Sequence, residues 1–125
     1  MLENDYIIKQ INMAINFLAS VLFKKDTTEY HNIKDEKGNV TYIGRTVLNL
    51  RQLADEGKIN EAEDLLFDEI EKNPKIDLLE AAIDFYGYLN EKDDSFLEEN
   101  NFSRQEIFEG LYDVQKIYGI EQIYK

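Results

Sequence analysis

The chain contains no cysteine and a single histidine, His31, among its 125 residues. Without cysteine it has no disulfide framework, no thiol nucleophile and no cysteine-ligated metal site, a composition that suits a reducing compartment. One histidine excludes metal centres built from several imidazoles. Its six glycines are scattered and form no phosphate-binding loop. The sequence therefore predicts no metal and no cofactor.

Long hydrophobic runs are also lacking. The most apolar stretch, residues 7–23, is interrupted by Lys9, Gln10, Asn12, Asn16 and Ser20, whereas a membrane-spanning helix needs roughly 18 or more apolar residues in succession. The opening Met-Leu-Glu-Asn-Asp carries acid where a secretory signal needs base. We therefore expect a cytoplasmic protein with no membrane segment.

Basic residues are few. The chain has 14 Lys and Arg against 26 Asp and Glu, so its net charge is −12 at pH 7. A surface of that sign repels nucleic-acid phosphates and anionic lipid headgroups, which makes nucleic acid and membrane poor partners. The excess of acids lies in the middle of the chain, because residues 51–100 hold five bases and sixteen acids. This segment is either a solvated helix face or a docking face for a cationic partner.

Length and hydrophobic pattern together predict the fold class. A chain of 125 residues, 43% of them hydrophobic, suits one domain with one core. Helical periodicity predicts an all-α fold of four to five helices in a single domain over residues 1–125. We expect an N-terminal helix over 1–25, a loop or hairpin over 26–44, and a bundle of helical hairpins over 45–125. Turn residues flanked by β-branched and aromatic side chains allow one short β-hairpin at residues 30–43.

The N-terminal helix carries one apolar stripe with spacings of three and four residues, made of Ile8, Ile11, Ile15, Leu18 and Leu22. Further apolar residues widen this stripe. A helix this apolar either packs against several neighbours or uses one flank for self-association. Core packing and a homodimer through this stripe are the two alternatives.

Four helix boundaries are marked strongly between residues 57 and 106. Gly57 is a natural helix end in a left-handed conformation, and Asn60 is suited to cap the helix that follows. That helix should end at Asn73-Pro74, because proline disfavours helical geometry in the residue before it. Ser103 and Glu106 have the spacing of a capping box and predict the start of the last helix.

Small or apolar residues recur at fixed places between residues 53 and 74, namely Leu53, Gly57, Ala62, Leu66 and Pro74. This pattern resembles a tetratricopeptide repeat, in which such residues let two helices pack closely. The resemblance covers about one repeat. It implies a tetratricopeptide-like helical hairpin, of the kind that presents a surface to a protein or peptide.

Three stretches of the chain, Glu3 to Ile8, Glu56 to Glu63 and Asn101 to Ile107, carry a second resemblance. They are similar to a small uncharacterised bacterial family of acidic helical proteins, a domain of unknown function. This resemblance implies a helical fold and a bacterial cytoplasm, and it brings no mechanism with it.

No catalytic constellation stands out. Two carboxylates suffice for glycoside hydrolysis, and Glu61, Asp64 and Asp68 share one face of a predicted helix. The same pattern is typical of any soluble acidic helix, so the sequence does not indicate an enzyme. These three acids are instead candidates for a face that binds a basic partner.

Two functions from different classes follow. The first is a protein-interaction or adaptor module whose acidic surface, around the three acids just named, receives a basic protein or peptide segment. The alternative is a small-molecule binder or minor enzyme with a pocket near Tyr30, His31, Tyr42 and Arg45, where aromatic walls would meet polar groups.

Overall fold

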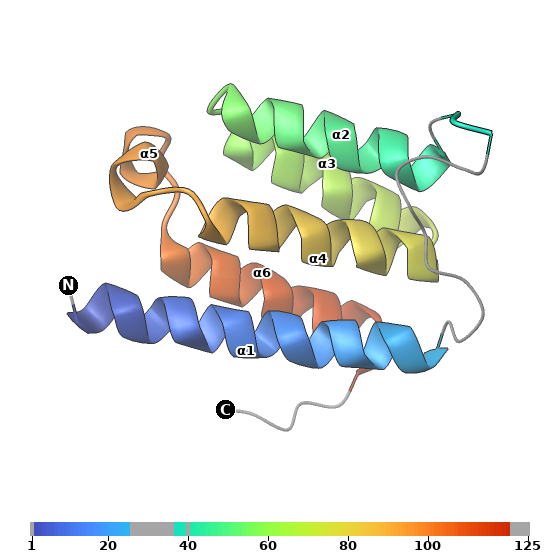
Figure 1. The fold of residues 1–125 in the computed structure, drawn as a ribbon, viewed down its shortest axis with the longest axis horizontal. Helices are drawn as coiled ribbons and strands as arrows, with labels where there is room; N and C mark the ends of the chain where they lie inside the picture. Colours follow the sequence, from blue (N-terminus) through green and yellow to red (C-terminus); the bar gives the residue numbers. More distant parts are fainter. Residues whose placement is uncertain (1, 26–36, 40, 121–125) are drawn as a thin grey trace.

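The computed structural model describes residues 2–25, 37–39 and 41–120. Throughout these residues the fold is all-helical, without a strand (Figure 1). The helices are α1 (Leu2–Lys25), α2 (Tyr42–Asp55), α3 (Ile59–Lys72), α4 (Ile76–Asn90), α5 (Asp94–Glu99) and α6 (Arg104–Ile117). The predicted all-α class is therefore confirmed.

Six helices are found in the described residues where four to five were predicted. The short additional helix is α5, which starts because the Asp93 side chain accepts a hydrogen bond from the Phe96 amide at 2.8 Å. The β-hairpin predicted at residues 30–43 lies mostly outside the described residues. Its final part is wrong, because Tyr42 and Ile43 begin α2, whose first turn is capped by Thr41.

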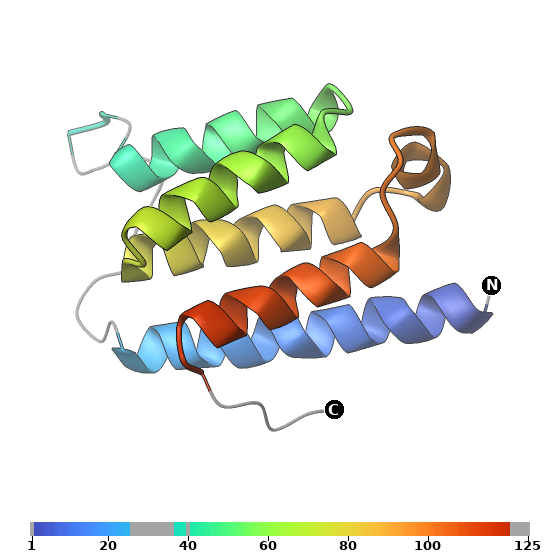
Figure 2. The ribbon, with the colours of Figure 1, turned by 180° about the vertical axis from the view of Figure 1, so that it is seen from behind.

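The five long helices lie in two layers (Figures 1 and 2). One layer holds α2, α4 and α1, and the other holds α3 and α6. The central helix is α4, which packs against α1, α2, α3 and α6. Its buried side chains are Leu78, Leu79, Ala81, Ala82, Phe85, Tyr86, Leu89 and Asn90. All six helices contribute to a single hydrophobic cluster around it.

Three helices end with the same backbone motif. The residue after the last turn has a left-handed conformation in each, at Gly57 (φ 81°), Asn101 (φ 58°) and Gly119 (φ 66°). The following amide then donates to the carbonyl five residues earlier, over 2.8 to 2.9 Å. This is the Schellman arrangement, which satisfies carbonyls that a helix end would otherwise leave unpaired. The predicted helix end at Gly57 is confirmed.

The turn at Gly57 makes α2 and α3 an antiparallel hairpin. Tyr42 at the start of α2 donates its hydroxyl hydrogen to Glu69 near the end of α3, over 3.3 Å. The predicted cap at Asn60 is wrong, because α3 begins at the fully buried Ile59 and Lys58 occupies the N-cap position. Whether this hairpin is arranged as in a tetratricopeptide repeat stays a prediction.

The other two predicted boundaries are confirmed. Helix α3 ends at Lys72, just before Asn73-Pro74. The capping box at the start of α6 is present, with the Ser103 amide donating to Glu106 Oε2 at 2.8 Å and the Glu106 amide donating to Ser103 Oγ at 3.2 Å. Both boundaries follow from backbone chemistry that is local in sequence.

A buried arginine joins the end of α4 to α5 and α6. Arg104, 9% exposed, donates from Nη1 to the backbone and side-chain oxygens of Asn90 at 2.8 and 2.9 Å. Its Nη2 donates to the Lys92 carbonyl at 2.6 Å, and its Nε donates to Asp94 at 3.0 Å. The guanidinium therefore fixes the corner that positions the first turn of α6.

Candidate functional site

A groove of about 250 Å³ lies between α3 and α6. Figure 2 looks onto the layer that holds these two helices. The groove is lined by Glu63, Asp64 and Phe67 of α3 and by Glu106, Glu109, Gly110 and Asp113 of α6. We call it the acidic groove, because five of these seven residues are carboxylic acids.

Helical spacing places these side chains on facing sides. On α6 the acids Glu106, Glu109 and Asp113 follow one another at intervals of three and four residues, which keeps them on one stripe of the helix. On α3 the lining residues fall within about one turn. Helix α4 holds the two walls together, because it packs against both helices.

A tyrosine from α4 lies under the groove. Tyr86 is fully buried, and its hydroxyl donates to Glu63 Oε2 over 2.5 Å. A Cβ atom at Gly110 would lie 2.2 Å from the Tyr86 hydroxyl oxygen and 2.3 Å from the ring carbon that bears it. The absence of a side chain at Gly110 therefore makes room for the hydroxyl, and the hydroxyl in turn fixes one oxygen of the Glu63 carboxyl.

Burial raises the pKa of the Glu63 carboxyl. The neighbouring carboxylates of Glu106, Asp64 and Asp113 act in the same direction, while the hydrogen bond from Tyr86 opposes them. Burial and the Glu63 charge likewise raise the pKa of the Tyr86 hydroxyl. The groove is therefore a place where further negative charge is unfavourable and where positive charge is favourable.

Positive charge is absent from the walls of the groove. None of its lining residues is basic, and its five acids form no ion pair within the described residues. Phe67 adds an apolar surface beside the carboxylates. An ammonium or guanidinium group on an aliphatic stem would complement both features, with its charge on the carboxylates and its methylenes on the ring.

The structure separates the three acids predicted to form a partner-binding face. Asp64 lines the acidic groove. Glu61 and Asp68 are exposed on α3 but are not among the lining residues. The prediction missed the acids of α6 and Glu63. The available signals were the three-and-four spacing of acids in the last helix and the glycine in its middle.

The stripe predicted for self-association on α1 lies largely in the core. Ile11 and Leu18 are 0% exposed, and Ile8, Ile15 and Leu22 are partly buried. This side of α1 packs against α4 and α6 of the same chain. Ile11 and Leu18 therefore have no exposed surface to offer a second copy, and self-association through the partly buried members of the stripe stays a prediction.

The alternative pocket stays a prediction. Tyr30 and His31 lie outside the described residues. Tyr42 and Arg45 are both exposed in the first turn of α2, and neither lines the acidic groove.

No three His, Cys, Asp or Glu side chains within residues 2–25, 37–39 and 41–120 are grouped so that they hold a metal ion. In the same ranges, no helix combines the length and the apolar character needed to cross a membrane.

Comparison with known proteins supports the family resemblance seen in the sequence. No curated protein and no solved structure matches the chain. A family described as "Family of unknown function (DUF6483)" matches residues 1–119. Because the match covers nearly the whole chain, this protein belongs to that family of unknown function.

Proposed function

We propose that this protein is a protein-interaction module whose acidic groove receives a basic segment of a partner protein. The proposal rests on one observation. Five carboxylates from two facing helices line a single groove, and no lining residue is basic. Cationic side chains that enter the groove would relieve the repulsion among these acids and form charge-assisted hydrogen bonds with them.

The spread of the acids favours an extended segment over a single cation. From Glu106 to Asp113 the lining extends over eight residues of α6, and the seven intervals between them correspond to about 10 Å at the 1.5 Å rise of an α-helix. An extended peptide covers about 10 Å in three residues. The groove therefore fits a segment with Lys or Arg at about every third position, so that two cations reach opposite ends of the acidic stripe.

The outer acids of α3 belong to the same proposal. Glu61 and Asp68 are exposed beside the groove-lining Asp64. We assign them the role of extending the negative field of the groove, which accelerates the approach of a basic partner more than it strengthens the bound complex.

Two finer expectations accompany this proposal. A tetratricopeptide-like character of the α2–α3 hairpin is supported by the Gly57 turn, by the fully buried Ala62 and by Pro74 just after α3. A cytoplasmic location is supported by the absence of cysteine, which suits a reducing compartment, and a bacterial origin is what the resemblance described in the sequence analysis implies.

The test is a binding titration with a fluorescent peptide that has lysine at every third position, with a glutamate version as the negative control. We expect binding of the lysine peptide only, and weaker binding as salt rises from about 0.05 to 0.3 M, because exposed charges are screened over about a Debye length. The absence of binding at low salt would contradict the proposal.

A matched pair of variants distinguishes the groove from general acidity. Glu109→Gln with Asp113→Asn removes two charges from the groove, and Glu61→Gln with Asp68→Asn removes two from outside it. All four side chains are exposed, so neither pair should disturb the fold. We expect the groove pair to weaken binding about tenfold and the outer pair about twofold. Equal losses would show that net charge, and not the groove, binds the peptide.

A further inference from the structure

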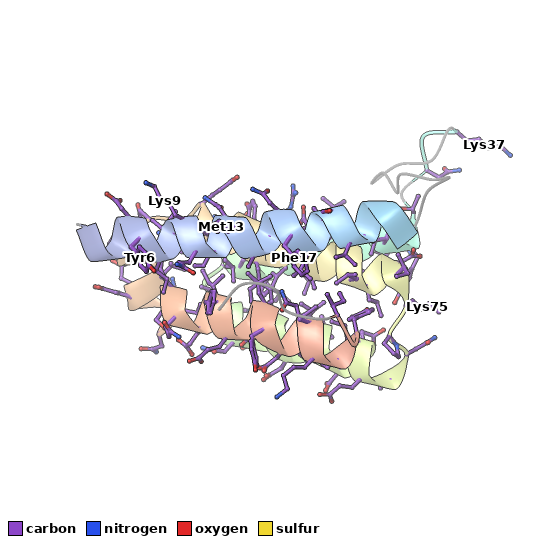
Figure 3. The ribbon with its side chains drawn as sticks, turned by 90° about the horizontal axis from the view of Figure 1, so that it is seen from below. Tyr6, Lys9, Met13, Phe17, Lys37 and Lys75 are labelled. Carbon is purple, nitrogen blue, oxygen red and sulfur yellow. The ribbon has the colours of Figure 1, made fainter. Side chains whose placement is uncertain are left out.

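The two most exposed large apolar side chains in the described residues both lie on α1. Tyr6 is 67% exposed and Met13 is 58% exposed. They are seven residues apart, which is close to two turns of an α-helix, so they lie on one stripe. Figure 3 looks onto this side of α1 and shows Tyr6, Lys9 and Met13 along it. The exposed Asn16 continues the same side one turn later.

The charge of this side of α1 differs from that of the rest of the molecule. Asp5 and Lys9 are the only charged residues from 5 to 22, so their net charge is zero, whereas α3 alone contains six acids and one base. In a two-fold dimer each surface packs against a copy of itself. An acidic face therefore repels its own copy, and a neutral face with apolar side chains does not.

The other exposed large apolar side chains of the described residues are not paired along one helix in this way. Tyr42 and Leu48 on α2 are six residues apart, so their positions differ by about 120° around the helix axis. Leu65 and Tyr112 are single exposed residues on α3 and α6, the two helices whose acids line the groove.

In the part of the chain that the structure describes, α1 buries the side that holds Ile11, Ala14 and Leu18 and exposes the opposite side. Helix α1 packs against α4 and α6, and the side chains of Asn12, Asn16 and Ser20 on its outer side are exposed and uncharged. With 24 residues, α1 is about 36 Å long. That length is sufficient for a helix-to-helix contact with a second copy over several turns.

We propose that the outer face of α1, defined by Tyr6, Lys9, Met13 and Asn16, is a homodimer interface that binds the same face of a second copy of this chain. This proposal does not depend on the function of the acidic groove. The groove is lined by α3 and α6 alone, so the proposed interface uses none of its residues, and a dimer would carry two grooves.

The dimer and the groove should respond to salt in opposite directions. Each chain carries a net charge of −12, and two such bodies repel each other at long range, so screening favours their association. Sedimentation equilibrium of the full chain at about 0.05 and 0.5 M NaCl should show a dimer that becomes tighter at the higher salt. A chain that is monomeric at both salts over the whole accessible concentration range would overturn the proposal.

Two substitutions locate the interface. Met13→Glu places an acid on the neutral face of both copies, and we expect the dimer Kd to rise roughly a hundredfold, because two-fold symmetry applies each change twice. Leu48→Glu adds the same charge at an exposed position of α2 and should leave the Kd within about twofold. A dimer that Met13→Glu leaves intact, or that Leu48→Glu weakens equally, would overturn the assignment.

A second substitution on the stripe protects the test against a folding defect. Tyr6→Glu changes a side chain that is 67% exposed and should weaken the dimer in the same direction as Met13→Glu. Circular dichroism and the melting temperature of each variant establish that it is folded before its association is measured. If both folded variants dimerise as the wild-type protein does, the interface is not on α1.

Discussion

Replacing Gly110 by alanine tests the packing beneath the acidic groove. The new Cβ atom would lie 2.2 Å from the hydroxyl oxygen of Tyr86 and 2.8 Å from a carbon at the edge of its ring. Tyr86 is fully buried, so its ring has no open space into which it can turn. The ring would have to tilt against the core, and the 2.5 Å hydrogen bond from its hydroxyl to Glu63 would be lost.

The expected cost follows from three contributions. Overpacking a filled core costs about 1 to 3 kcal/mol. Loss of the hydrogen bond to a partly buried carboxyl costs about another 1 to 3 kcal/mol. Alanine offsets about 1 kcal/mol of this cost, because it is a better helix former than glycine. We therefore expect Gly110→Ala to lower the free energy of unfolding by about 3 kcal/mol, or the melting temperature by roughly 10 °C in a domain of this size.

Gly87→Ala is the matched control. Gly87 also lies inside a helix, α4, but a Cβ atom there would meet only Ile15 Cδ1, at the ordinary contact distance of 3.8 Å. We expect this variant to gain about 0.5 to 1 kcal/mol. Urea unfolding followed by circular dichroism measures both variants. A Gly110→Ala protein as stable as the wild type would refute the packing argument. If Gly87→Ala were destabilised, it would not serve as a control for helix propensity alone.

Two further predictions concern charged side chains. Because burial raises the pKa of Glu63, its neutral form stabilises the fold below the ordinary glutamate pKa, and this contribution is lost as the pH rises through the raised value. The stability of Glu63→Gln relative to the wild type should therefore increase from about pH 4 to pH 8. The exposed Glu61→Gln is the control for the loss of a charge. A stability difference between Glu63→Gln and the wild type that does not change with pH would contradict this reasoning. Arg104→Met removes a buried guanidinium with four hydrogen bonds and should cost about 2 to 4 kcal/mol in urea unfolding. Arg51→Met breaks a pair with an aspartate in which the arginine side chain is 36% exposed, and it should cost under about 1 kcal/mol; similar losses for both arginines would refute the role of burial.

Local backbone chemistry explains which parts of the fold could be predicted from the sequence. The left-handed turn at Gly57, the end of α3 before Pro74 and the capping box at Ser103 each depend on a few neighbouring residues. The start of α2 was misassigned because Tyr42 and Ile43 favour strands by composition. In the protein, the cap supplied by Thr41 and the burial of Ile43 favour a helix there.

The candidate site could not be assembled from the sequence in the same way. Its two walls are about 40 residues apart along the chain, at Glu63 to Phe67 and Glu106 to Asp113, and only packing on α4 brings them together. The prediction reached Asp64 from the acidity of α3 alone. The hydrogen bond between Tyr86 and Glu63 joins two helices, and nothing in the local pattern of either helix indicates that contact.

The central position of α4 has a consequence for how this domain comes apart. Because α4 packs against the other four long helices, the departure of any one of them would expose its apolar side chains to water. Partly opened forms are therefore costly, and the chain should lose its helices in one cooperative step. The backbone amide hydrogens of α4 should accordingly be the slowest in the protein to exchange with deuterated solvent, at a rate set by opening of the entire domain.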